Sequence, residues 1–147
     1  MVKAKFLRRF WAWLADGIAV WIVSAAIGAA VTFFVNASAT SSDFMSFLTA
    51  WVALFLIIVI FLLQFLYFGL LWSRPGGQTL GMKIFNMRLV RRSGGPVGFL
   101  RAGLRGTVGY WISSFLFFLG YIWAAFDSEK EAWHDKIFDT WVVETKE

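Results

Sequence analysis

The chain has 147 residues, of which 59% are hydrophobic, 20% aromatic and only 16% charged. Soluble domains are about half apolar and about a quarter charged, so this composition indicates a membrane protein. With no cysteine, the chain excludes disulfides, thiolate metal sites, iron–sulfur clusters and cysteine nucleophiles. The net charge of +5 comes from residues flanking apolar segments, which favours anionic lipid and membrane orientation over nucleic acid.

The first apolar segment covers residues 10–35 and follows a basic start made of Lys3, Lys5, Arg8 and Arg9. A cleaved signal peptide is the alternative, because residues 37–39 read Ala-Ser-Ala, like a cleavage site. However, the run is far longer than the roughly 7–15 apolar residues of a signal peptide, and it contains Asp16. We therefore expect a retained membrane helix.

A short polar loop, 36–43, separates this segment from a second apolar segment, 44–72. Trp51 and Trp72 stand near its two ends. At the rise of an α-helix they lie about 31 Å apart, the thickness of a bilayer's hydrocarbon core. The spacing predicts a nearly upright helix with these tryptophans as interfacial anchors.

Residues 73–98 form a polar, glycine-rich and basic loop. Within it, 78–85 is compatible with a short interfacial helix, 86–90 alternates like a strand, and 94–96 read as a turn. The glycines of 76–83 superficially suggest a phosphate loop, but the G-x-x-x-x-G-K-[ST] pattern and a preceding strand are missing. A helix start at the membrane surface explains this stretch better than nucleotide binding.

The third apolar segment, 99–126, has Arg101 and Arg105 in its first two turns and carries small residues suited to close helix packing. A polar tail, 127–147, follows and contains a strand-like piece at 140–143. Two alternatives stay open. The segment either crosses fully and leaves the tail outside, or bends at Gly109 or Gly120 and returns the tail to the cytoplasm.

The distribution of basic residues predicts the orientation. The N-terminus and the 73–98 loop carry nine of the fourteen Lys and Arg residues, whereas the 36–43 loop carries none. Cytoplasmic loops are the ones enriched in Lys and Arg. We expect the N-terminus and the long loop to face the cytoplasm.

Asp16 is the most informative polar residue, because a carboxylate within a membrane helix marks a functional site by default. Its candidate partners are Arg9, Gln64 and Arg105. Asp16 and Gln64 have similar depths of about 10 and about 12 Å, so a hydrogen bond between them is expected. Asp16 is either a structural point that fixes the helices together or a proton- or cation-binding group.

His134 and Asp135 form the other polar pair. As the sole histidine in a chain without cysteine, His134 cannot make a metal site by itself. Asp135 could orient the imidazole, and a solvated tail is the alternative. No G-x-S-x-G nucleophile elbow occurs. We predict no enzymatic activity, no metal and no cofactor.

Several motifs together resemble the RDD family, small bacterial membrane proteins named for one arginine and two aspartates. The similarity covers nearly the whole chain. Its elements are Arg9-Phe10-Trp11-Ala12-Trp13-Leu14-Ala15-Asp16, Gly77-Gln78-Thr79-Leu80-Gly81-Met82-Lys83, the strand-like Met87-Arg88-Leu89-Val90, the basic pair Arg101 and Arg105, Trp133-His134-Asp135-Lys136 and the closing Thr140-Trp141-Val142-Val143.

The resemblance assigns the family's three residues to Arg9, Asp16 and Asp135. One departure is Asp139, where the family usually has a glycine before the threonine. The resemblance also implies that the tail returns to the Arg9 side and that its strand pairs with 86–90. The expected fold is an all-α membrane protein with three apolar helical segments, the third bent or re-entrant, and a small cytoplasmic two-strand element.

Transport is presumed for the family, and some members are implicated in sodium/proton antiport. The resemblance thus implies cation or proton transport in the bacterial cytoplasmic membrane. Three helices are too few to enclose a path, so transport requires a homo-oligomer. The alternative is an accessory or assembly subunit of a larger membrane complex; an interfacial enzyme using His134 is the least favoured. The candidate polar cluster comprises Arg9, Asp16, Gln64, Arg105, His134 and Asp135.

Overall fold

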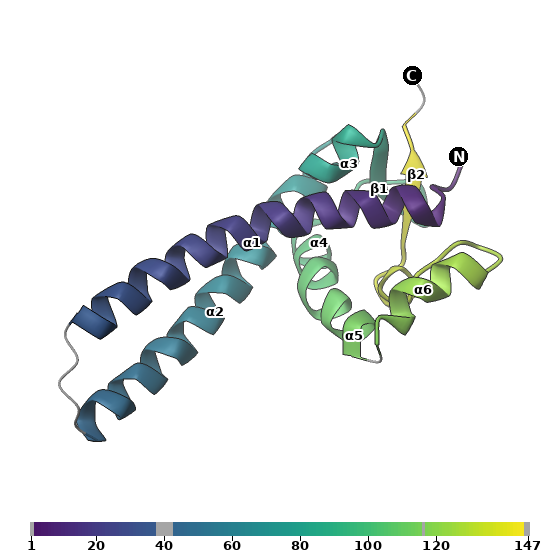
Figure 1. Cartoon of the computed structure of the whole chain (residues 1–147). Helices are drawn as coiled ribbons and strands as arrows, with labels where there is room; N and C mark the ends of the chain where they lie inside the picture. The colour runs from purple at the N-terminus through teal and green to yellow at the C-terminus, as the bar shows by residue number, and fades with distance from the viewer. Residues whose placement is uncertain (1, 38–42, 116, 146–147) are drawn as a thin grey trace.

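Two long helices project together from a compact base (Figure 1). The computed structural model describes residues 2–37, 43–115 and 117–145. Helix α1 spans Phe6–Ala37 and helix α2 spans Asp43–Ser73. Both are long and apolar enough to cross a membrane. Residues 38–42, which hold most of the predicted 36–43 loop and part of the cleavage-like 37–39 stretch, lie outside the described residues.

The base is built from short elements that follow α2. They are helix α3 (Leu80–Ile84), strand β1 (Met87–Arg91), helix α4 (Phe99–Leu104), the π-helix η1 (Arg105–Gly109), helix α5 (Tyr110–Phe115), helix α6 (Leu119–Phe126), helix α7 (Trp133–Ile137) and strand β2 (Thr140–Glu144). The predicted all-α membrane fold with a small two-strand element is confirmed.

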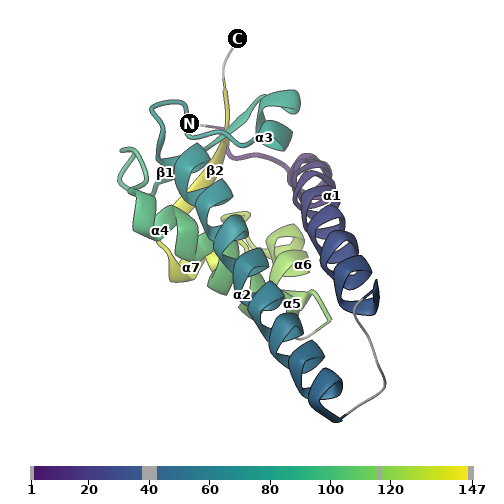
Figure 2. The same ribbon diagram turned by 90° about the vertical axis from the view of Figure 1, so that its left-hand side faces the viewer.

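The third apolar segment is bent. Its two parts, 99–115 and 119–126, meet at 88°. Phe117 and Phe118 at the break have φ of 48° and 61°, the left-handed region that bulky side chains rarely adopt. The predicted bend is therefore confirmed, but it does not lie at Gly109 or Gly120, because both are within helical turns. After the bend, helix α6 turns back toward the start of α1, which it contacts (Figures 1 and 2).

The small residues of the third segment permit close packing. A Cβ on Gly103 would lie 2.5 Å from the ring of Phe65, and Gly106 is pressed equally closely against Phe68. Both aromatic residues belong to α2, against which α4 and η1 pack. The predicted small-residue packing face is therefore confirmed.

Strands β1 and β2 pair antiparallel, with Leu89 opposite Val142. The predicted pairing of the tail strand with the mid-chain strand is confirmed. The chain start joins the same sheet, because the amide of Ala4 donates to the carbonyl of Val142 at 3.0 Å. The N-terminus, the 73–98 segment and the tail thus lie at one end of the molecule (Figure 2).

Trp72 is not an interfacial anchor. It is fully buried, and its indole Nε1 donates to the sulfur of Met82 at 3.2 Å, whereas Trp51 is 56% exposed. The prediction for Trp72 was wrong because the last turn of α2 enters the base, where Phe68 stacks on the indole at a centroid distance of 4.5 Å.

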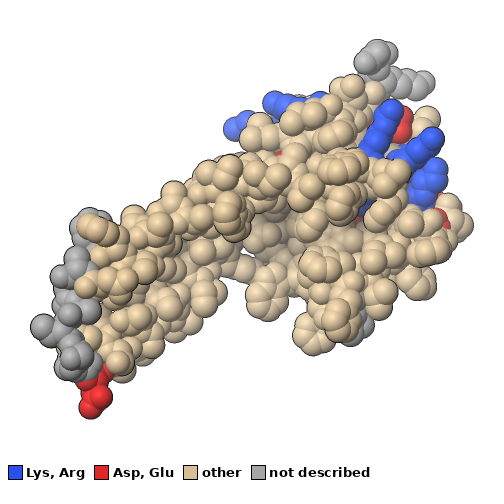
Figure 3. Space-filling model, viewed as in Figure 1, with Lys and Arg blue, Asp and Glu red and all other residues tan. Residues whose placement is uncertain are grey.

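Basic residues gather at the end that holds the termini (Figure 3). The projecting helices present an uncharged surface to the viewer as far as their tip, where α2 begins with Asp43. Aliphatic and aromatic side chains such as Trp21, Phe55 and Ile57 are more than half exposed there. Together with the length of both helices, such a surface is typical of segments that cross a membrane.

Candidate functional site

Asp135 lies between two arginines in the base. Asp135 belongs to α7 and is fully buried. Its carboxylate forms ion pairs with the guanidinium groups of Arg9, from α1, and Arg105, from η1. Oxygen Oδ1 accepts from Nη2 of Arg105 at 2.5 Å, and Oδ2 accepts from Nη2 of Arg9. The amide of Ala132 also donates to Oδ2, at 3.0 Å. We call Arg9, Arg105 and Asp135 the arginine–aspartate cluster.

Charge keeps Asp135 ionised. Burial raises the pKa of Asp135, but the two guanidinium groups of Arg9 and Arg105 outweigh it and hold the pKa well below its usual value. Removing either partner from such a buried set leaves an uncompensated charge. The cluster therefore ties α1, the third segment and the tail together.

Arg105 is held by more than its carboxylate. Its Nε donates to the hydroxyl of Thr140 at 3.1 Å, and its Cζ lies 4.6 Å from the ring centroid of Trp72. The side chain is 1% exposed, and Nη1 has no hydrogen-bond partner among the described residues.

Gln64 supports the backbone around Arg105 instead of contacting Asp16. Its Nε2 donates to the carbonyl of Gly106 at 3.0 Å, within the π-helix that Arg105 begins. Such π-turns are rare and concentrate at functional sites. The hydrogen bond expected between Asp16 and Gln64 does not form, because both side chains have other partners.

Asp16 joins α1 to α2 and to the glycine-rich motif. Its carboxylate accepts from the hydroxyl of Tyr67 at 2.7 Å, the hydroxyl of Thr79 at 2.5 Å and the amide of Gly81 at 2.8 Å. Thr79 is also the N-cap of α3. The predicted helix start in this stretch is confirmed. We call Asp16, Tyr67, Thr79 and Gly81 the Asp16 site; Tyr67 was missed because an interfacial tyrosine carries no partner signal in sequence.

His134 is buried beside the arginine–aspartate cluster, so the solvated-tail alternative is wrong. Its Nδ1 lies 2.9 Å from the hydroxyl of Ser113, and its Nε2 lies 3.6 Å from Oδ1 of Asp135. The rings of Tyr110 and Tyr121 lie 4.9 and 5.1 Å away. Burial lowers the pKa of His134 well below its usual value, which favours the neutral imidazole.

A cavity of about 340 Å³ opens beside these groups, between α1, α6 and the base. Its polar lining includes Asp16, Arg9, Arg105 and His134, so four of the six predicted site residues meet at one space. Asp135 lies behind the arginines, and Gln64 lines a different crevice between α1 and α2.

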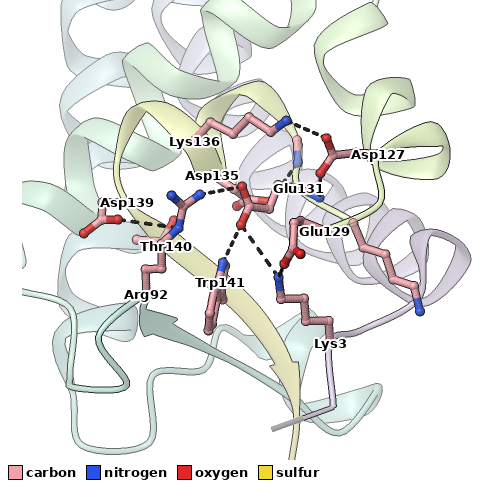
Figure 4. A network of polar contacts seen from close by, with 12 residues as sticks. Lys3, Arg92, Asp127, Glu129, Glu131, Asp135, Lys136, Asp139, Thr140 and Trp141 are labelled. Carbon is pink, nitrogen blue, oxygen red and sulfur yellow. Dashed lines mark hydrogen bonds and ion pairs between the residues drawn. The ribbon is translucent and has the colours of Figure 1, made fainter.

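A second buried acid, Glu131, organises the outer edge of the base (Figure 4). It accepts from Arg92 at 2.6 Å and from the indole of Trp141, and Lys3 lies 3.8 Å away. Lys3 also pairs with Glu129. Glu131 is buried because Lys3, Arg92 and Trp141, from three separate parts of the chain, surround its carboxylate.

Comparisons with known proteins agree with this architecture. The sequence profile of the RDD family matches residues 3–139. The "Uncharacterized protein YxaI" of Bacillus subtilis (strain 168) is 31% identical over 147 aligned residues, covering 95% of this chain and 96% of that protein. No solved structure matches the chain significantly. The chain is a multi-pass membrane protein that belongs to the RDD family.

Proposed function

We propose that this protein is an accessory or assembly subunit of a larger complex in the bacterial cytoplasmic membrane, with its N-terminus in the cytoplasm. The observation that carries the proposal is the α1–α2 pair, whose two helices contact each other sparsely. A crevice of about 490 Å³ lies between them, lined by Gly17, Ser24, Ala25 and Gln64 among others.

Small residues support a helix as the occupant of this crevice. Ser24 lies about two turns after Gly17 on α1, and Ala25 is next to it, so small residues line the crevice and allow another helix backbone to approach closely. The hydroxyl of Ser24 has no hydrogen-bond partner among the described residues. A transmembrane helix of a partner protein would fill the space and offer that hydroxyl a partner.

The contacts of Asp16 argue against cation binding at this residue. A metal cation is bound by oxygen acceptors with free lone pairs. Here a hydroxyl of Tyr67, a hydroxyl of Thr79 and an amide all donate to the carboxylate. The carboxylate therefore acts as a joint between helices.

Photo-crosslinking from the crevice tests the proposal. A photoreactive residue at Ala25 should crosslink to one membrane protein that also copurifies in mild detergent, and Ala25→Trp should abolish the copurification. The same photoreactive residue at Ile22, which is 57% exposed and outside the crevice, is the matched control. Recovery of this chain alone, without crosslinks from Ala25, contradicts the proposal.

Cation or proton transport by a homo-oligomer is the second candidate, favoured by the cavity that Asp16 and His134 line. Purified protein in liposomes should then show flux driven by a sodium or pH gradient, and Asp16→Asn should abolish it. Asp43→Asn, the same substitution at the exposed start of α2 and outside the cavity lining, is the control. Flux equal to that of empty liposomes refutes this candidate.

A further inference from the structure

The cavity between α1, α6 and the base has two chemically different parts. Its walls are largely apolar and aromatic, with Phe10 and Trp13 from α1 and Phe118 and Ile122 from the bend and α6. Two guanidinium groups, those of Arg9 and Arg105, line the same space. Long apolar walls combined with a few fixed polar groups are typical of a ligand pocket.

Arg105 has hydrogen-bonding capacity to spare. A guanidinium group has five N–H donors. Asp135 and Thr140 engage Nη2 and Nε, and the side chain of Tyr110 also lies beside the guanidinium group. Nη1 still has no hydrogen-bond partner among the described residues, although the side chain is 1% exposed. A buried donor without an acceptor is destabilising, so an acceptor within the cavity would relieve it.

The charges around Arg105 favour an anionic acceptor. One carboxylate, Asp135, is shared by two guanidinium groups. Asp16 also lines the cavity, but its oxygens accept from neutral donors, and no ion pair joins it to Arg9 or Arg105 in the described part of the chain. One positive charge of the arginine–aspartate cluster thus lacks a direct counterion.

We propose that this cavity binds the acidic head of a membrane amphiphile, with the anionic group on Arg105 and the chain along the aromatic wall. The cavity lies at the basic end of the membrane helices, where lipid head groups are found. Its 340 Å³ is near the lower end of ligand-pocket volumes and suits an anionic group with the first part of a chain. The phosphate of an anionic phospholipid and the carboxylate of a fatty acid share this chemistry.

Lipid binding to the purified full chain tests the proposal. The protein is held in an uncharged detergent, and native mass spectrometry measures binding of phosphatidylglycerol, oleate, phosphatidylcholine and inorganic phosphate. Phosphatidylglycerol or oleate should bind in preference to phosphatidylcholine. Arg105→Gln should weaken that binding about tenfold or more, the effect of a lost charge-assisted hydrogen bond.

A second variant tests the cavity without touching the arginine–aspartate cluster. Ala124 is buried in α6 and lines the cavity, so Ala124→Leu should fill it and reduce anionic amphiphile binding. Ala125→Leu, at the next, exposed position outside the lining, is the matched control. Circular dichroism checks that each variant is helical.

The outcomes separate cleanly. Preferential binding of phosphatidylglycerol identifies a phospholipid and that of oleate a fatty acid, and both support the proposal if Ala124→Leu abolishes binding while Ala125→Leu does not. Equal binding of phosphatidylcholine overturns it, as does binding of inorganic phosphate without either amphiphile. Unchanged binding in Ala124→Leu also overturns it, because the occupied space would then lie elsewhere.

Discussion

Arg9 and Asp135 form a buried ion pair although 126 positions separate them in the chain. Arg9 also donates from Nη1 to the carbonyl of Lys130 at 2.5 Å, so two hydrogen bonds join the first turn of α1 to the tail. The contact requires the third segment to bend, because the tail must return to the helix start. Two of the three residues assigned to the family's name therefore hold the ends of the chain together.

Asp135→Asn should be the most destabilising single change in the arginine–aspartate cluster. It leaves Arg9 and Arg105 facing a neutral amide, and breaking a buried pair costs about 3–5 kcal/mol. Arg9→Gln should cost less, because Arg9 keeps 12% of its side chain exposed and Arg105 still neutralises the carboxylate. Thermal unfolding in detergent, followed by tryptophan fluorescence, measures the order.

Lys136→Gln is the control for this pair of variants. Lys136 pairs with Asp127 at 2.5 Å, but its side chain is 42% exposed. A surface ion pair contributes within about 1 kcal/mol. If Asp135→Asn were no more destabilising than Lys136→Gln, the arginine–aspartate cluster would not hold the fold together.

Asp16→Asn should destabilise the protein by about 1–3 kcal/mol, because the amide nitrogen must face a donor. Thr79→Val, which removes one of the three donors, should produce a smaller loss. Chemical denaturation in mixed micelles compares the two. Equal stability of Asp16→Asn and the wild type would show that the three donors do not hold an ionised carboxylate.

Gly81→Ala should be destabilising by about 1–3 kcal/mol, the range for overpacking. A Cβ at this position would collide with the carbonyl oxygen of Ala12 in α1. Gly28→Ala, in the same apolar helix α1 and with open space around its Cβ, should instead be neutral or stabilising. If Gly81→Ala and Gly28→Ala changed the melting temperature in the same direction and by the same amount, the close contact between α1 and α3 would be contradicted.

Acidification should destabilise the protein through His134. Its pKa is lowered in the folded state by burial, so the unfolded chain binds more protons below the ordinary histidine pKa of about 6.5. The stabilising contribution is complete above that pH and decreases as the pH falls below it, by at most about 1.4 kcal/mol per pH unit. Unfolding free energies between pH 7.5 and 5, at about half-unit steps, should show this slope in the wild type and lose it in His134→Gln. The same slope in both proteins assigns it to other groups.

Asp139→Gly should stabilise the turn before β2, by up to about 1 kcal/mol. Asp139 has φ of 52°, a left-handed conformation that favours glycine. The family's usual glycine suits this backbone. In this chain Asp139 adopts it, and its carboxylate oxygens lie 3.7 Å from Nε of Arg92 and 3.7 Å from Nη1 of Arg101. Asp139→Val should be clearly destabilising. A lower melting temperature for Asp139→Gly than for Asp139→Val would contradict the account.

Sequence patterns predicted the features that depend on periodicity. Apolar runs predicted both long helices, and alternation together with the family resemblance predicted the pairing of β1 with β2. Depth along a helix, however, does not fix which way a side chain faces. Gln64 has the expected depth, but Tyr67, one turn nearer the base, is the residue that reaches Asp16.

The features that the sequence did not predict depend on packing between distant parts of the chain. The π-turn at Arg105 has no local signature, because it forms where α2 and the tail converge on that helix. The position of Trp72 at the end of an apolar run is typical of an interfacial residue. In the structure the 73–98 segment and the third apolar segment enclose its side chain. Glu131 is polar in sequence, and its burial depends on Lys3, Arg92 and Trp141 arriving from distant parts of the chain.

The central claim is that both ends of the chain lie on the same side of the membrane, joined by Arg9 and Asp135. Green fluorescent protein and alkaline phosphatase, fused in turn to each terminus, report which side each end occupies. The account predicts fluorescence without phosphatase activity at both ends. Fluorescence at the N-terminus with phosphatase activity at the C-terminus would place Asp135 across the membrane from Arg9 and contradict it.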